Sequence, residues 1–135
     1  MKLKTMKTLL KTETIFEDCG IMDDHEIKSA CGEDLEIKNA CGADLMSDVL
    51  AFSNQKTLLL TGLTNPQVVR TAEMVEIKVI VFVRGKKPQV ETISLANQLN
   101  ICLYSTEKSL FESCGLLYKN GIGPEAMNYI EETSK

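Results

Sequence analysis

The sequence has no apolar run long enough to cross a lipid bilayer, and its first residues lack the apolar core of a signal peptide. These two absences predict a cytoplasmic protein without a membrane partner. A general nucleic-acid-binding surface is also not expected, because 15 lysines and arginines are outnumbered by 19 aspartates and glutamates, for a net charge of −4. The five cysteines are an odd number, which favours reduced thiols over a disulfide framework.

The motifs that would indicate an enzyme are missing as well. The phosphate-binding pattern GxxxxGK[ST] is absent, because Gly85 and Lys86 are followed by Lys87 rather than by a hydroxyl residue, and no GxGxxG follows a predicted strand. His25, the one histidine, lies in an acidic segment where a surface role is favoured over general-base catalysis. No Cys-x-x-Cys pair supports a metal or iron–sulfur site. We predict no catalytic residue, no metal, no cofactor and no enzymatic activity.

Three units, each a strand followed by a helix, occupy the second half of the chain. Their strands are apolar runs without alternation, which is typical of strands buried on both faces. The predicted strands are 57–62, 79–83 and 101–104, and the helices that follow them are 66–75, 88–99 and 107–119. Asn65 is a favourable N-cap before Pro66, and Asn100 suits the left-handed end of a helix. The alternation predicts an α/β, Rossmann-like three-layer domain with a mostly parallel sheet of βα units.

The N-terminal segment carries Leu3, Met6 and Leu10 at helical spacing. This spacing predicts a short amphipathic helix. A basic face would allow such a helix to lie on a membrane surface, but the apolar face is small and has no aromatic residue. Packing on the domain or on a partner subunit is therefore the favoured interpretation.

A direct repeat follows, in which 36–45 is nearly identical to 26–35. We interpret the two copies as short strands or a β-arc, with turns at Gly32 and Gly42. A short helix comes next, and Asp44 is placed to cap it. Asp44 and its acidic neighbours would alternatively hold a cation, but the cap is the simpler interpretation.

Segments 41–52, 58–69, 80–85 and 103–106 resemble the DRTGG-domain family, and the resemblance covers roughly 26–121. It implies a Rossmann-like domain that pairs as a homodimer and has no catalytic activity of its own. Other members carry this domain beside CBS domains, phosphate acetyltransferase domains or pyrophosphatases, and it is similar to the non-catalytic N-terminal domain of the kinase that phosphorylates HPr. The naming motif aligns with 34–40, where only Asp34 is retained.

The chain is thereby divided into three parts. These are an N-terminal helix and connection (1–20), the DRTGG-like α/β domain (21–121) and a polar C-terminal tail (122–135).

Ligands of open parallel sheets bind outside the carboxyl ends of the strands. In this sequence those ends carry hydroxyl groups, glycines, helix N-termini and cations, which together suit an anion. The candidate ligand-binding residues are Thr61, Gly62, Thr64, Asn65, Arg84, Gly85, Lys86, Ser105 and Thr106. The basic cluster at Arg84 and Lys86 would either clamp a phosphate or carboxylate group or keep a strand end solvated.

These expectations predict a regulatory or ligand-sensing module that binds a nucleotide or another phosphate-bearing small molecule and forms a homodimer. The alternative is a protein-interaction or structural dimerisation module that serves a partner enzyme.

Overall fold

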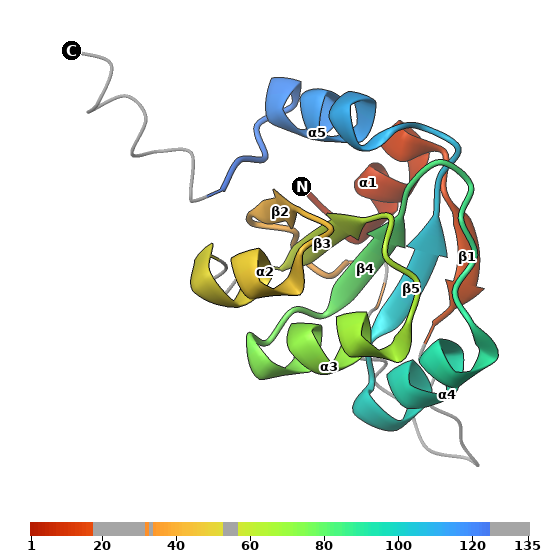
Figure 1. The fold of residues 1–135 in the computed structure, drawn as a ribbon. Helices are drawn as coiled ribbons and strands as arrows, with labels where there is room; N and C mark the ends of the chain where they lie inside the picture. The colour runs from red at the N-terminus through yellow and green to blue at the C-terminus, as the bar shows by residue number, and fades with distance from the viewer. Residues whose placement is uncertain (18–31, 33, 53–56, 125–135) are drawn as a thin grey trace.

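The computed structural model describes residues 1–17, 32, 34–52 and 57–124. In this part of the chain, five strands form one sheet in the order β1-β5-β4-β3-β2 (Figure 1). The strands are β1 (Glu13–Phe16), β2 (Ala40–Gly42), β3 (Leu58–Thr61), β4 (Val79–Phe82) and β5 (Cys102–Ser105). Strands β2 to β5 run parallel, whereas β1 pairs antiparallel with β5. The predicted mostly parallel sheet is confirmed.

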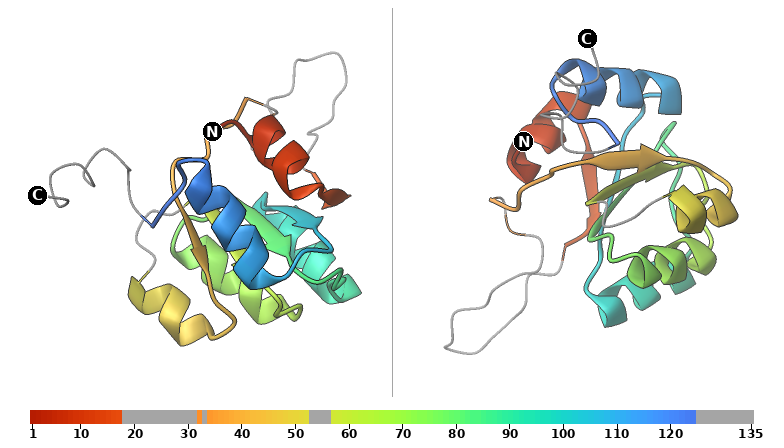
Figure 2. Two further views of the ribbon diagram at one scale, coloured as in Figure 1. Left: turned by 90° about the horizontal axis from the view of Figure 1, so that it is seen from above. Right: turned by 90° about the vertical axis from the view of Figure 1, so that its left-hand side faces the viewer.

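Helices cover both faces of the sheet and complete the predicted three layers. They are α1 (Leu3–Leu10), α2 (Met46–Phe52), α3 (Pro66–Met74), α4 (Val90–Leu99) and α5 (Leu110–Lys119). Figure 2 shows α1 and α5 on one face and the other three helices on the opposite face. None of the described helices has the length and apolar character needed to span a membrane.

The central strands have no polar face because each face meets a helical layer. Leu58 and Leu60 of β3 belong to the core beneath α1 and α5, whereas Leu59 belongs to the core above α2, α3 and α4. Alternate side chains of β4 and β5 are divided in the same way, and all residues of the three strands are buried. The unbroken apolar runs of these three strands therefore indicate that both faces of the strands are buried.

Two helix ends lie where the sequence predicts them. Asn65 Oδ1 accepts a hydrogen bond from the Gln67 amide at 3.1 Å and caps α3, and Asn100 ends α4 with φ of 57°. Helix α5 begins later than predicted, at Leu110. Its N-cap is Ser109, whose hydroxyl accepts from the Glu112 amide at 3.1 Å.

The N-terminal helix packs on the domain, as the favoured interpretation holds, since Leu3, Met6 and Leu10 are fully buried. Strand β1 follows it and was not predicted. Lys7 of α1 and Tyr104 of β5 both donate to Glu17, at 2.7 and 2.9 Å. Partial burial raises the pKa of Glu17, but the bonds from Lys7 and Tyr104 and the charge of Lys7 together lower it below its usual value.

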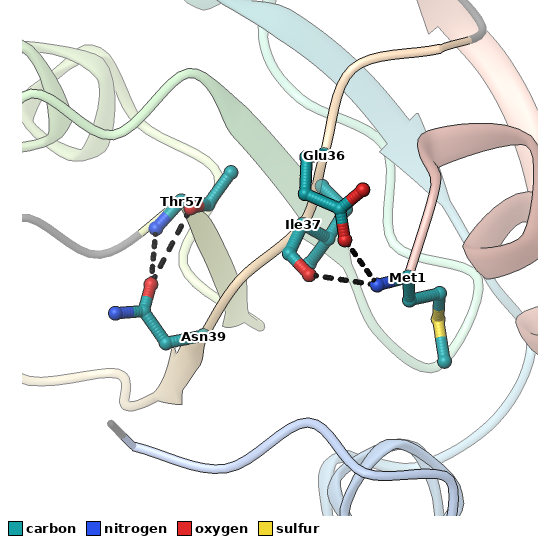
Figure 3. A network of polar contacts seen from close by, with 5 residues as sticks. All are labelled: Met1, Glu36, Ile37, Asn39 and Thr57. Atoms are coloured by element: carbon teal, nitrogen blue, oxygen red, sulfur yellow. Dashed lines mark hydrogen bonds and ion pairs between the residues drawn. The ribbon is translucent and has the colours of Figure 1, made fainter. Parts of the chain in front are cut away.

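Residues 34–39 are held between the N-terminus and the start of β3 (Figure 3). The Met1 amine donates to Glu36 Oε2 at 2.6 Å and to the Ile37 carbonyl at 3.2 Å. Asn39 Oδ1 accepts from the Thr57 amide at 2.9 Å. These contacts fix the path of the chain into β2, which pairs with β3 at the edge of the sheet.

Three expectations are corrected. Gly42 does not make a turn, because it pairs with Leu60 as the last residue of β2. Asp44 does not cap α2; its carboxylate bonds elsewhere, as described below. Cys102 is disulfide-bonded, so the prediction of reduced thiols is wrong for this residue, whereas Cys41 and Cys114 are not in a disulfide. His25, most of the first repeat copy and residues 125–135 lie outside the described residues.

Candidate functional site

A cleft of about 660 Å³ lies at the carboxyl ends of β2, β3 and β4, beside the first turn of α5. Three of the predicted ligand-binding residues line it, namely Gly62, Arg84 and Lys86. The loops after the central strands therefore converge on the side of the sheet that the sequence predicts. Asp44 and the first turn of α5 complete the lining and were not among the predicted binding residues.

Arg84 is held in the left-handed region, with φ of 59°, and Gly85 follows it with φ of 67°. The Arg84 amide donates to the Lys108 carbonyl at 2.8 Å, and the Gly85 amide donates to the Thr106 carbonyl at 2.7 Å. These bonds tie the loop after β4 to the segment that precedes α5. A left-handed residue with a β-carbon costs roughly 1–2 kcal/mol, so the loop holds Arg84 at the cleft against a local penalty.

The guanidinium of Arg84 and the ammonium of Lys86 are exposed. Neither makes an ion pair with any residue that the structure describes. A side chain at Gly85 would be strained by its φ of 67° and would displace the exposed Glu107 carboxylate, which lies 2.6 Å from the position of an added β-carbon. The loop thus presents two cations at one wall of the cleft.

Gly62 lies on the floor between two long side chains. An added β-carbon there would be 3.6 Å from Asp44 Oδ1 and 3.8 Å from Lys86 Cδ. These are ordinary van der Waals distances, so Asp44 and Lys86 both pack against the backbone at the end of β3.

Asp44 changes the predicted chemistry of this floor. Its Oδ1 accepts from the Gly62 amide at 2.7 Å and from the Thr61 hydroxyl at 3.1 Å. Both donors were predicted to bind an anionic ligand, and the protein's own carboxylate takes them instead. Contacts from Thr61 and Gly62 to an anion stay a prediction, and they would require these two bonds to Asp44 to be shared or exchanged. No local pattern in the sequence identifies these partners of Asp44, because they depend on β2 lying beside β3.

The first turn of helix α5 also lines the cleft and can supply donors to a ligand there. Ser109, Leu110 and Phe111 line the cleft, and the Ser109 cap bonds only the amide of Glu112. First-turn amides of a helix have no intrahelical acceptor, and the helix dipole favours an anion beside them. Phe111 is 90% exposed at the rim, which is unusual for a phenylalanine.

The remaining predicted residues hold loops together and do not line this cleft. The Thr64 carbonyl accepts from the Thr92 hydroxyl at 2.7 Å, and Asn65 caps α3. Ser105 accepts from Lys87 at 3.0 Å, and the Thr106 hydroxyl donates to the Leu10 carbonyl at 2.6 Å. Gly85 belongs to the same supporting group, because its amide is bound to Thr106.

The cleft offers binding groups rather than a reactive one. Burial raises the pKa of the Cys114 thiol, and Cys41 raises it further, so Cys114 is a poor nucleophile near neutral pH. No three histidine, cysteine, aspartate or glutamate side chains gather to hold a metal ion in the described residues. The arrangement can bind a ligand with acidic groups at the Arg84 wall and hydrogen-bond donors near Asp44.

No protein-family model and no curated protein sequence matches this chain. Among solved structures, the chain is similar to the CBS and DRTGG domains of the regulatory region of Clostridium perfringens pyrophosphatase, in complex with the activator diadenosine tetraphosphate. The TM-score is 0.63 at 16% sequence identity, over 95% of this chain and 49% of that chain. The likeness shows a shared fold, and this chain spans about half the length of its neighbour.

Proposed function

We propose that this chain is a non-catalytic regulatory module whose cleft binds a phosphate-bearing small molecule, with a nucleotide as the leading candidate. The observation that carries the proposal is the pair of exposed cations, Arg84 and Lys86, which line one cleft together with the first turn of α5. Cations and helix N-termini are the groups that bind phosphate most often.

The position of Asp44 restricts how such a ligand would lie. Two like charges 4 Å apart repel by roughly 4 kcal/mol near a protein surface, so phosphate groups would stay away from the Asp44 carboxylate. They would lie between Arg84 and the first turn of α5. Asp44 would then accept hydrogen bonds from ribose hydroxyls or base amines, which inorganic phosphate lacks. A nucleotide carries both kinds of group, phosphates for Arg84 and the first turn of α5 and hydroxyls or amines for Asp44.

The neighbouring structure supports the choice of ligand to test first. It is a regulatory region that was solved with a nucleotide activator. The cleft volume of about 660 Å³ also falls within the range of 300–1,000 Å³ that is usual for small-molecule sites.

Isothermal titration calorimetry with diadenosine tetraphosphate, ATP and inorganic phosphate would test the proposal. We expect a nucleotide to bind and the Arg84→Ala variant to lose about tenfold or more in affinity, because a charge-assisted contact is removed. Arg70→Ala is the matched control, since Arg70 is exposed on α3 and does not line the cleft. No binding by either nucleotide, or equal affinity in the Arg84→Ala variant, would contradict the proposal.

A dimerisation module that serves a partner enzyme is the second candidate. It is favoured by the exposed aromatic side chains of α5, Phe111 at 90% and Tyr118 at 55%. Co-purification of a second protein with the tagged chain, lost on Phe111→Ser substitution, would support this candidate.

A further inference from the structure

Phe111 is the most exposed of the large apolar side chains in the part of the chain that the structure describes, at 90%. It is the second residue of α5 and lines the cleft together with Leu110 and Cys114 of the same helix. Phe111 and Cys114 are three residues apart, so they lie on one side of the helix. The exposed ring therefore belongs to the side of α5 that borders the cleft.

The start of α5 holds the backbone of Phe111 in place. The Ser109 hydroxyl accepts from the Glu112 amide at 3.1 Å and caps the helix, and Leu110 packs against the core beneath α1 and α5. Glu112 is paired with Lys108 at 3.7 Å, so the negative charge next to the ring is partly balanced. The chain thus keeps an aromatic ring in water at the edge of the cleft.

An exposed aromatic ring at a binding cleft is a surface on which a planar ligand can stack. Burial of an aromatic side chain is favourable, and Phe111 gains almost none of this benefit within the chain. The bases of nucleotides stack on aromatic side chains with little dependence on which base is present, because every base has a π-face. Arg84 and Lys86 in the same cleft suit the phosphate groups of such a ligand.

We propose that the base of a bound nucleotide stacks on Phe111, and that this contact makes the cleft select ligands in which phosphate groups are joined to a base. The inference rests on the proposed function, because it assigns a second contact to the same ligand. Inorganic polyphosphates and sugar phosphates meet the cations alone, whereas a nucleotide meets the cations and the ring. Phe111 therefore selects for the presence of a base and discriminates little between bases.

Calorimetry with ATP and with inorganic tripolyphosphate, on the wild-type chain and on Phe111→Ala, separates the two contacts. We expect Phe111→Ala to weaken ATP binding about tenfold, a usual loss when a stacked aromatic residue is replaced by alanine, and to leave tripolyphosphate binding unchanged. Tyr118→Ala is the matched control, because Tyr118 is a second exposed aromatic residue of α5 and does not line the cleft. It should leave both affinities unchanged.

Phe111→Trp is the conservative replacement. The sequence contains no tryptophan, so this variant places a single tryptophan at the cleft. It should keep the wild-type affinity for ATP, because the stacking surface is retained. Its fluorescence should be quenched by ATP and not by tripolyphosphate, and fluorescence that does not respond to ATP would overturn the stacking contact.

Arg84→Ala, measured alongside, distinguishes a failure of this inference from a failure of the proposed function. If Arg84→Ala weakens ATP binding and Phe111→Ala does not, the assignment of Phe111 is wrong and the proposed function stands. The same holds if the wild-type chain binds tripolyphosphate as tightly as ATP, or if Phe111→Ala weakens both ligands equally. A wild-type chain that does not bind ATP would overturn the proposed function and this inference with it.

Discussion

Replacing Arg84 separates the stability of the cleft loop from its binding chemistry. Arg84 has φ of 59°, and its side chain is exposed without an ion pair to any described residue. Arg84→Gly removes both the guanidinium and the β-carbon that makes this backbone conformation unfavourable. Arg84→Ala removes the guanidinium and keeps the β-carbon.

The expected difference in stability between Arg84→Gly and Arg84→Ala follows from two opposing contributions. Relief of the left-handed penalty stabilises by roughly 1–2 kcal/mol. The additional backbone freedom that glycine gives the unfolded chain costs roughly 0.5–1 kcal/mol. We therefore expect Arg84→Gly to be more stable than Arg84→Ala by about 1 kcal/mol, or about 4 °C in melting temperature for a chain of this size.

Urea unfolding followed by circular dichroism measures this difference directly, with the slope against urea unchanged between the two variants. Calorimetry with diadenosine tetraphosphate on the same samples should show an equal loss of affinity in both, because both lack the guanidinium. An Arg84→Gly variant that is no more stable than Arg84→Ala would refute the strain at this position. A variant that retains wild-type affinity would refute the role of the cation.

Three further substitutions probe other contacts of the same fold. Gly85→Ala should destabilise by about 1 kcal/mol in urea unfolding, because φ is 67° and the exposed Glu107 carboxylate must move away from the new β-carbon; a loss below 0.5 kcal/mol in this measurement would contradict the strain expected at this position. Asp44→Asn keeps an oxygen acceptor for Gly62 but replaces the second carboxylate oxygen, which would accept from the ribose or base, so calorimetry should show weaker nucleotide binding; unchanged or tighter binding would contradict this role of Asp44. The pKa of the Glu17 carboxylate in the folded chain is lower than its usual value of 4.5. The ionised carboxylate therefore stabilises the folded state above pH 4.5, and this contribution is lost as the pH falls below 4.5. Glu17→Gln should therefore lower the free energy of unfolding by about 1 kcal/mol or less at pH 7, with the deficit shrinking below pH 4.5; a deficit independent of pH would contradict this linkage.

The sequence was sufficient to predict the strands that are buried on both faces and the helix ends that depend on a single residue. Strands β3, β4 and β5 are continuous apolar runs, and Asn65 and Asn100 lie at the helix ends where their side chains and backbone preferences place them. Strand β1 escaped prediction because Glu13 and Thr14 are exposed and the strand is formed by antiparallel pairing with β5, which no local pattern encodes.

The candidate site was predicted in part for the same reason. Gly62, Arg84 and Lys86 follow parallel strands, so their convergence could be inferred from topology. Asp44 could not be assigned, because its partners depend on β2 lying beside β3 in a register that places Gly42 opposite Leu60. The contribution of α5 depends on how that helix crosses the sheet edge, which is a property of tertiary packing.

The cleft is most directly tested by an NMR titration of the ¹⁵N-labelled chain with diadenosine tetraphosphate. The competing surface is a groove of about 420 Å³ between α3 and α4, which Arg70 and Gln98 line. We expect the largest amide shifts at Gly62, Arg84 and Phe111, with Arg70 and Gln98 unchanged. Saturable shifts confined to the α3–α4 groove, or no shifts at all, would contradict a nucleotide site at the carboxyl ends of the central strands.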